Sequence, residues 1–411
     1  MPLRVTFLVN EINLKTGGGS HHTFELTTRG LRDLGFDIRV IALNGASARD
    51  GAELPGRVTV ETGWQRSTRY GRIRAVADIL RRHERDTDLF HIFSPGWAPA
   101  GGLYRADGPV PTVATLNSYS LWCTNMDQMD GRCQRHCTIV QRTMHAPMPP
   151  LRKALSVPAR VLEHRAFSWV QHIDHFMPNS PGTKRVYEEA GFNLARSTMI
   201  PALIDFAALR AASQRPWLDR AARHGPKHVL YAGRLASTKG VDLLLDALPH
   251  LAHRVEVHIA GDGPERASLE ARASALGVSD QVTFHGWVPN RRLWDMLQRV
   301  DIFVHPGRWP EPCGRSVQEA MALGIPTIAS DLGGPPWLLG RHGWTFRPGD
   351  AADLARQLDT LTASYDDALL TAADGIERAA EFDYPRWAPQ LARIYETVSA
   401  SSPSPLAAAA R

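Results

Sequence analysis

The chain has 411 residues, a formal net charge of +5 and an isoelectric point near 9.2. A single hydrophobic core rarely serves a chain of this length, so we expect two domains of about 200 residues each. Hydrophobic residues make up 43% of the chain and charged residues 22%, as in water-soluble globular proteins, and no apolar run approaches the roughly 20 residues that span a bilayer.

The first predicted strand covers residues 4–10. Its apolar run is short and ends at a polar break, which indicates a buried strand rather than a signal peptide. The four cysteines are too few for a disulfide framework. We therefore expect a cytoplasmic protein.

A glycine cluster, Gly17-Gly18-Gly19, separates this strand from a helix that runs to about Leu34. Residues 37–43 form the next predicted strand. Three consecutive glycines let a ligand approach the backbone closely, and a helix N-terminus favours phosphate. A flexible loop is the alternative. A dinucleotide-binding loop is disfavoured, because the glycine spacing differs and no acidic residue follows the second strand.

Predicted strands and helices go on alternating through the first half. The strands cover residues 88–93, 110–116, 173–178 and 198–201, and the helices cover residues 72–83, 151–170 and 179–190. Such alternation is typical of a parallel sheet covered by helices.

Three cysteines near the middle of this half raise a zinc hypothesis. Cys123, Cys133 and Cys137 have His136 and His145 nearby, and thiolates and imidazoles are zinc ligands. Cys133 and Cys137 would share one face of a helix. No Cys-x2-Cys pair is present, so buried thiols without a metal are the alternative. Our prediction is that the protein holds no metal.

Basic residues cluster between positions 132 and 165. Few aromatic residues interleave with them, which argues against a groove for single-stranded nucleic acid, and we expect no nucleic-acid partner. An anionic acceptor, or peripheral contact with the anionic inner face of a membrane, suits the stretch better. A solvated surface is the alternative.

A stretch rich in Ala and Arg, residues 204–226, marks a predicted linker between the halves. The same alternation then restarts. The strands cover residues 228–233, 254–260, 281–286, 300–304, 325–329 and 343–348, and the helices cover residues 241–251, a segment ending at 276, 290–299, 315–323, 351–364, 365–381 and 384–395. The fold class is therefore α/β, with two Rossmann-like, doubly wound parallel sheets.

Two cations lie five residues apart in the loop after the first strand of the second half. Arg234 follows Gly233 directly, and Lys239 precedes the next helix. An arginine can bind a phosphate through two N–H groups, and a lysine adds a compact positive charge. The spacing indicates a phosphate site, and an ordinary solvated loop is the alternative.

Two carboxylates bracket the start of the helix predicted at residues 315–323. Glu311 lies in the loop before it, and Glu319 lies one turn inside it. The backbone N–H groups between them form an anion site of the kind found at helix N-termini. As alternatives, Ser316-x-x-Glu319 is a capping box and Glu311 an ordinary loop residue. The helix is predicted to stop at Gly324, through a left-handed cap.

This stretch resembles the Glu-x7-Glu motif of the retaining glycosyltransferases of family 4. These enzymes have the GT-B fold, in which two Rossmann-like domains face a central cleft. The resemblance implies that Glu311 contacts hydroxyls of the donor sugar and that Glu319 contacts the ribose of the nucleotide. It also implies that the donor phosphate and sugar bind to the backbone amides of Cys313, Gly314, Arg315, Ser316 and Val317.

Further segments are similar to the same family. In the first half, Gly18 and Gly19 correspond to the glycine loop that faces the donor diphosphate. In the second half, Gly233, Arg234 and Lys239 correspond to the site that neutralises the leaving diphosphate, which often makes a divalent metal unnecessary.

The loop containing Trp287 and Val288 resembles the family loop that holds the nucleobase through backbone contacts, although Trp287 could equally serve packing. Two positions depart from the family pattern. Asn117 stands where a histidine usually contacts the donor sugar or the reacting centre; an amide forms hydrogen bonds but does not titrate. Cys313 replaces the usual aromatic residue.

The resemblance predicts a retaining transferase that moves a sugar from a nucleotide-diphosphate donor, with a UDP-sugar favoured, onto a small-molecule, lipid-linked or glycan acceptor. Arg234, Lys239, Glu311 and Asn117 are the candidate catalytic residues. His21, His22, Tyr119 and Trp122 are the candidate acceptor-side residues, and no further cofactor is expected. The rival hypotheses are a nucleotide-sugar epimerase and a non-catalytic sugar-nucleotide-binding subunit.

The predicted domain limits follow from these assignments. Residues 1–203 form the acceptor-side domain, and residues 204–386 form the nucleotide-sugar-binding domain. Residues 387–400 form a helix that crosses back to the first domain, and residues 401–411 are a disordered tail.

Overall fold

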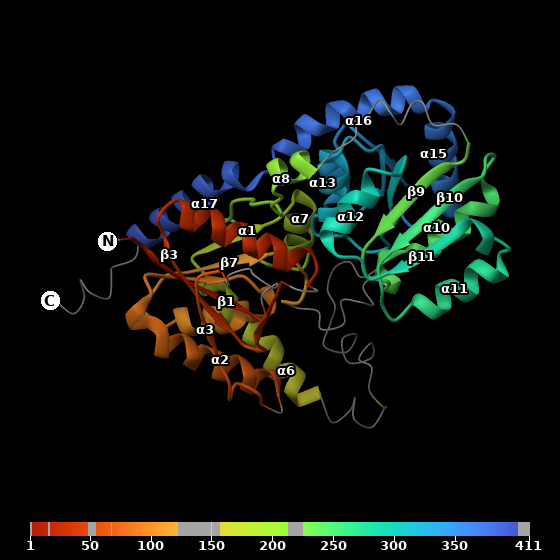
Figure 1. Cartoon of the computed structure of the whole chain (residues 1–411). Helices are drawn as coiled ribbons and strands as arrows, with labels where there is room; N and C mark the ends of the chain where they lie inside the picture. Colours follow the sequence, from red (N-terminus) through yellow and green to blue (C-terminus); the bar gives the residue numbers. More distant parts are fainter. Residues whose placement is uncertain are drawn as a thin grey trace.

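The computed structural model describes residues 2–14, 17–47, 55–66, 68–121, 149, 157–212 and 225–401. Within these residues, two parallel six-stranded sheets are each covered by helices on both faces (Figure 1). This is the α/β architecture that the alternating pattern predicts.

The first sheet has the strand order β5-β3-β1-β6-β7-β8, and every pairing in it is parallel. Its strands are β1 (Arg4–Val9), β3 (Asp37–Ala42), β5 (Arg57–Val60), β6 (Leu89–Ile92), β7 (Thr112–Leu116) and β8 (His175–Pro178). The first-half helices are α1 (Gly19–Asp33), α2 (Arg69–His83), α3 (Ala98–Arg105), α6 (Val157–Ala166) and α7 (Pro181–Glu189). A separate short pair joins β2 (Ile12–Asn13) to β4 (Ala46–Ser47).

The second sheet has the order β11-β10-β9-β12-β13-β14, and its pairings are also parallel. Its strands are β9 (Lys227–Ala232), β10 (Val255–Ala260), β11 (Val282–Gly286), β12 (Ile302–His305), β13 (Thr327–Ser330) and β14 (Trp344–Phe346). The second-half helices are α8 (Phe206–Ala212), α10 (Val241–Ala247), α11 (Arg266–Ala275), α12 (Asn290–Leu297), α13 (Arg315–Ala322), α14 (Pro335–Leu339), α15 (Ala351–Ala363), α16 (Tyr365–Ala380) and α17 (Tyr384–Ala400).

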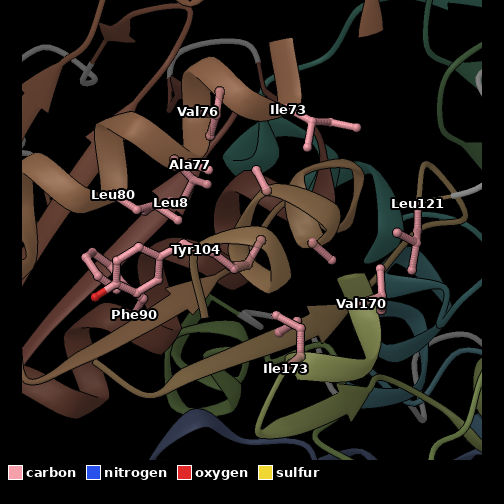
Figure 2. Packing of buried hydrophobic residues seen from close by; sticks show 14 of the residues in the cluster. Leu8, Ile73, Val76, Ala77, Leu80, Phe90, Tyr104, Leu121, Val170 and Ile173 are labelled. Carbon is pink, nitrogen blue, oxygen red and sulfur yellow. The ribbon is translucent and has the colours of Figure 1, made fainter. Parts of the chain in front are cut away.

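Buried apolar side chains fill the space between the first sheet and the helices on one of its faces. Figure 2 shows Leu8 and Phe90 from the sheet against Val76 and Leu80 of α2 and Tyr104 of α3. All five side chains are fully buried. Burying a side chain of this size contributes about 1.5–3 kcal/mol relative to leaving it in water, so this cluster stabilises the first domain.

Helix α17 carries the end of the described chain back onto the first domain, where it runs alongside α1 (Figure 1). Its Leu391 and Tyr395 belong to the apolar core on the second face of the first sheet. Gly30 of α1 permits this approach, because an added Cβ there would lie 2.7 Å from the Cβ of Ala388. The crossing helix therefore fastens the two domains together.

Several sequence predictions differ from the structure. Residues 198–201 are not a regular strand, although the backbone N–H groups of Thr198 and Ile200 donate to Phe176 O and Pro178 O of β8 and an isolated bridge joins Ser197 to Phe176. The predicted linker contains helix α8, which packs into the core of the second domain. Strand β5 and helix α3 were not predicted, since β5 is short and largely exposed and α3 is rich in Ala and Gly. The domain limits at 203/204 and 386/387 stay predictions.

No helix among the described residues is both long and apolar enough to cross a membrane. Most of the basic stretch, and Cys123, Cys133 and Cys137 with His136 and His145, lie outside the described residues. The zinc hypothesis and the membrane-contact hypothesis therefore stay predictions.

Candidate active site

A cavity of about 730 Å³ lies between the two domains. Its wall in the first domain includes Gly18, Gly19 and Asn117, and its wall in the second includes Arg234 and Glu311. These residues follow the carboxyl ends of parallel strands, where ligands bind in open α/β sheets. The cavity thus brings together segments that lie far apart in the chain.

Glu311 has two polar side-chain partners in the wall of this cavity. Its Oε2 accepts a hydrogen bond from Trp309 Nε1 at 2.7 Å and forms an ion pair with the ammonium of Lys239. Burial of Glu311 opposes its ionisation, but Lys239, together with His305 and the hydrogen bond from Trp309, lowers its pKa below the usual value. Glu311 is therefore a carboxylate, able only to accept hydrogen bonds.

The helix start beside Glu311 has an open N-terminus. Gly314 is the N-cap of α13 and has a φ of +99°, and no side chain caps the helix. The Val317 N–H is bonded to the carbonyl of Gly314, so the amides of Arg315 and Ser316 precede the first bonded donor of the helix. Both residues line the cavity. The capping-box alternative for Ser316 is wrong, because Ser316 lies inside the helix.

The other end of α13 matches its prediction. Gly324 has a φ of +64°, its N–H donates to Met321 O, and the N–H of Ile325 donates to Ala320 O. This is the Schellman arrangement that a glycine makes possible. The helix is therefore held at one end by Gly324 and presents its other end to the cavity.

Arg315 and Glu319 form a second buried pair in the cavity wall, with Arg315 Nε 3.1 Å from Glu319 Oε1. Burial lowers the pKa of Arg315 and raises that of Glu319, and each charge partly offsets the effect on the other. The stem of Arg315 touches the glycine loop of the first domain, since a Cβ added at Gly19 would lie 3.3 Å from Arg315 Cβ. A side chain at position 19 would therefore crowd Arg315.

The loop that carries the two predicted phosphate-binding cations is held in place by a hydrogen bond from Tyr231 and by close packing of the neighbouring loop. Tyr231 donates a hydrogen bond from its hydroxyl to the carbonyl of Arg234 at 2.9 Å. The neighbouring loop approaches so closely that a Cβ at Gly261 would lie 1.8 Å from the carbonyl oxygen of Gly233. Arg234 and Lys239 both line the cavity. The structure therefore places both cations on the same wall as Glu311.

Side chains of the first domain also form hydrogen bonds with the backbone on both sides of Glu311. Tyr119 donates from its hydroxyl to Pro310 O at 2.7 Å. Ser180 and Thr183 donate from their hydroxyls to Pro312 O at 2.5 and 3.0 Å. Because these bonds flank Glu311 on both sides, they determine where its carboxylate lies relative to the first domain.

The candidate acceptor-side residues lie in different environments. His22 lines the cavity, but its Nε2 accepts a hydrogen bond from Asn290 Nδ2 of the second domain at 2.5 Å. Tyr119 is fully buried, and neither it nor His21 contributes to the cavity lining. Asn117 lines the cavity and donates to Phe93 O at 3.3 Å. Trp122 lies outside the described residues.

The remaining predicted binding residues are mostly on the cavity wall. Gly233, Val288 and Cys313 line it, whereas Val317 is buried beneath it. Trp287 lines it with a side chain that is 49% exposed, which disfavours a purely packing role. Burial raises the pKa of the Cys313 thiol to about 12, so this thiol is neutral.

Sequence reasoning missed two histidines on the cavity wall. His91 is buried, with hydrogen bonds that join Nδ1 and the Tyr395 hydroxyl at 2.5 Å and Nε2 and Thr115 Oγ1 at 2.7 Å; the neutral ring donates in one of them and accepts in the other. His305 ends strand β12 and is 4% exposed. His91 stands inside the strand predicted at residues 88–93 and His305 directly follows the one predicted at 300–304, and a histidine in or next to an apolar run is the signal that could have drawn attention to them. Over the described part of the chain, no group of three or more potential ligands could hold a metal ion.

The family model described as Glycosyltransferase Family 4 matches residues 16–208, and the model described as Glycosyl transferases group 1 matches residues 219–377. The lipopolysaccharide core biosynthesis glycosyltransferase LpsE of Rhizobium meliloti is 26% identical over 334 residues, which are 81% of this chain and 86% of that protein. The mannosylfructose-phosphate synthase of Agrobacterium fabrum is 38% identical over 141 residues, 31% of each chain.

Among solved structures, HepE of Anabaena in complex with UDP superposes with a TM-score of 0.71 at 20% identity, covering 96% of this chain and all of that one. The same protein has been solved with UDP-glucose. The GT-B fold prediction is confirmed by this likeness together with the two family models. The two family models together cover both domains, and the chain belongs to the family 4 (group 1) glycosyltransferases of the GT-B fold.

Proposed function

We propose that this glycosyltransferase is a retaining enzyme that uses a UDP-sugar as donor. The observation that carries the proposal is the convergence of Glu311, Arg234, Lys239 and the open start of α13 on one cavity between the domains. A nucleoside diphosphate sugar combines two anionic phosphates with a hydroxyl-rich ring. Cations with helix amides suit the phosphates, and an ionised carboxylate suits the ring.

The donor can be assigned to the second domain in parts. Trp287 and Val288 would hold the base, and Glu319 would accept hydrogen bonds from the ribose. The amides of Arg315 and Ser316, with Arg234 and Lys239, would hold the diphosphate. Glu311 would orient the sugar. The structures of HepE with UDP and with UDP-glucose support a uridine diphosphate donor by analogy of fold.

The proposed reaction breaks the bond between the anomeric carbon and the UDP oxygen. The acceptor oxygen forms its new bond to the same carbon on the same face, and its proton passes to the departing diphosphate oxygen. The products are UDP and a glycoside with the donor's anomeric configuration. Arg234 and Lys239 stabilise the negative charge that develops on the diphosphate, so positioning and electrostatics lower the barrier without a protein nucleophile.

The acceptor lies on the side of the first domain, near Asn117 and the glycine loop. The broad match to a lipopolysaccharide core glycosyltransferase supports a glycan or glycolipid acceptor. We propose a cytoplasmic enzyme whose basic stretch at residues 132–165 contacts the inner face of a membrane.

Thermal unfolding with a panel of free nucleotides tests the donor assignment. UDP, GDP, ADP, dTDP and NAD are compared with and without EDTA. A ligand at 100 times its dissociation constant adds about 2.7 kcal/mol of stability. Stabilisation by UDP alone, unchanged by EDTA, is the expected result. Stabilisation by another diphosphate would overturn the UDP assignment, and a response to none would favour a non-catalytic subunit.

A further inference from the structure

His305 is a buried side chain at the carboxyl end of strand β12, on the wall of the cavity. Neither of its ring nitrogens has a hydrogen-bond partner among the residues that the structure describes. Buried polar groups without partners are rare, because each forfeits its bonds to water. An imidazole in this position therefore calls for a polar group from outside the protein.

The distance from His305 to Glu311 defines where that group would lie. His305 Nε2 is 4.0 Å from Glu311 Oε2, too far for a direct hydrogen bond. A single oxygen at about 2.8 Å from both atoms would meet them at an angle of about 90°. Gly307 leaves room beside this nitrogen, since a Cβ there would already lie 3.4 Å from His305 Nε2. The distance between the two atoms therefore suits one bridging oxygen atom.

The protonation states select the kind of oxygen. Burial lowers the pKa of His305 to about 4, so the ring is neutral near pH 7 and can offer one N–H donor. Glu311 is ionised and can only accept. An oxygen between them must accept from one and donate to the other. A hydroxyl does both, whereas a phosphate or carboxylate oxygen would be repelled by Glu311.

Donor binding would also open Glu311 to such a hydroxyl. In the structure, Lys239 is ion-paired with Glu311 Oε2. The diphosphate proposed above carries more negative charge than one carboxylate and competes for the same ammonium. As Lys239 turns toward it, Glu311 gains the capacity to accept from the sugar.

We propose that His305 and Glu311 together bind one hydroxyl of the donor sugar, which accepts from the imidazole N–H and donates to the carboxylate. His305 is then a specificity-determining residue that rejects donors lacking this hydroxyl. The inference rests on the proposed function and adds a second protein group to its sugar site.

The test combines a change in the protein at position 305 with the removal of one hydroxyl from the donor, and measures whether the two effects on affinity are coupled. Affinities for UDP and for three donors, UDP-glucose, UDP-galactose and UDP-N-acetylglucosamine, are measured by calorimetry on the full chain. The donor that the wild type binds most tightly is then compared with its 3-deoxy and 4-deoxy analogues. The variants are His305→Phe, which keeps a planar ring without polar atoms, and His305→Gln, which restores a donor and an acceptor.

We expect the wild type to lose about tenfold in affinity for one deoxy analogue. The His305→Phe variant should bind the parent donor about tenfold more weakly and be indifferent to that same deletion, while its affinity for UDP stays within about twofold. The His305→Gln variant should recover part of the discrimination. If the Phe variant does not fold, the comparison of wild type with His305→Gln still tests the coupling.

Two results would overturn the inference. One is a loss on deoxygenation that is equal in wild type and variants, and the other is a loss of UDP affinity as large as the loss of donor affinity. If the wild type binds neither UDP nor any of the donors, the proposed function fails and the inference fails with it. If the wild type binds them without any coupling to position 305, only the inference fails.

Discussion

Lys239 and Glu311 are joined by an ion pair across the cavity wall, although they are 72 residues apart in the chain. Their side chains are 21% and 16% exposed. Trp309 braces the pair, since its indole N–H donates to the same carboxylate oxygen and its ring lies 5.1 Å from the ammonium. The charge that is proposed to bind phosphate is thus held by the carboxylate that is proposed to bind sugar.

This pair predicts strong coupling between the two positions. Removing one partner leaves an uncompensated buried charge, so Lys239→Met and Glu311→Gln should each lower the free energy of unfolding by about 3 kcal/mol. The double variant should lose less than the sum, because no charge is then left unpaired. Denaturant unfolding of the four proteins measures the coupling.

The exposed pair between Arg254 and Asp280 is the control for that cycle, and neutralising it should leave the free energy of unfolding nearly unchanged. Additive effects of Lys239→Met and Glu311→Gln would contradict the buried coupling.

Arg234 should act on turnover more than on donor binding. The charge it is proposed to stabilise develops as the diphosphate leaves, so Arg234→Ala should lower kcat by about 100-fold and change the donor KM much less. Steady-state kinetics with the donor found by thermal unfolding measures both. Arg347 has a side chain that is 69% exposed and lies away from the cavity, so Arg347→Ala is the control. A rise in KM with kcat intact would show that Arg234 only binds the donor.

His91 should make the protein less stable in mild acid. Burial lowers the pKa of His91 to about 3, well below its ordinary value of 6.5. Between these two values the unfolded chain binds a proton that the folded chain does not, so stability is complete above about pH 6.5 and falls with decreasing pH. At pH 5 this residue alone should account for about 2 kcal/mol of loss.

The His91→Gln variant removes this titration. Its free energy of unfolding should therefore fall less steeply than that of the wild type between pH 7 and pH 5, whatever its value at pH 7. Denaturant unfolding at several pH values gives both slopes. Parallel curves would show that His91 is not the group responsible.

We expect Gly333 to be required both for its positive φ and for its close approach to the backbone of Glu311. Gly333 and Gly349 have φ angles of +78° and +79°, so alanine is strained equally at both. A Cβ at Gly333 would lie 2.4 Å from Glu311 O, whereas a Cβ at Gly349 meets nothing within 4 Å. Gly333→Ala should therefore destabilise the protein by about 1–3 kcal/mol more than Gly349→Ala.

The same comparison has a catalytic readout. Because Gly333 packs on the backbone of Glu311, its replacement should displace the carboxylate and lower activity, while Gly349→Ala keeps activity. Thermal unfolding and kcat/KM of the two variants check both parts. Equal losses in both variants would mean that the backbone conformation, not the contact with Glu311, explains the glycine.

Much of the fold and part of the candidate site could be predicted from the sequence. Alternating apolar and helical segments indicated two parallel sheets, because hydrophobic periodicity and turn residues are local properties of the chain. The glycines at 18 and 19, the cations at 234 and 239 and the carboxylate at 311 could be named because loops after strands collect ligand-binding groups, and Glu319 could be named from its spacing to Glu311. The left-handed cap at Gly324 was predictable because a glycine at the end of a helical pattern is a local signal.

The tertiary structure alone decided which of these groups meet. Three contacts join segments that are distant in the chain: the ion pair of Lys239 with Glu311, the close approach of Gly19 to Arg315, and the hydrogen bond from the Tyr119 hydroxyl to Pro310 O. The orphaned ring of His305 and its distance to Glu311 likewise appear only after folding. Local pattern determines strands, helices and caps, whereas partners, burial and pKa depend on packing that no single segment contains.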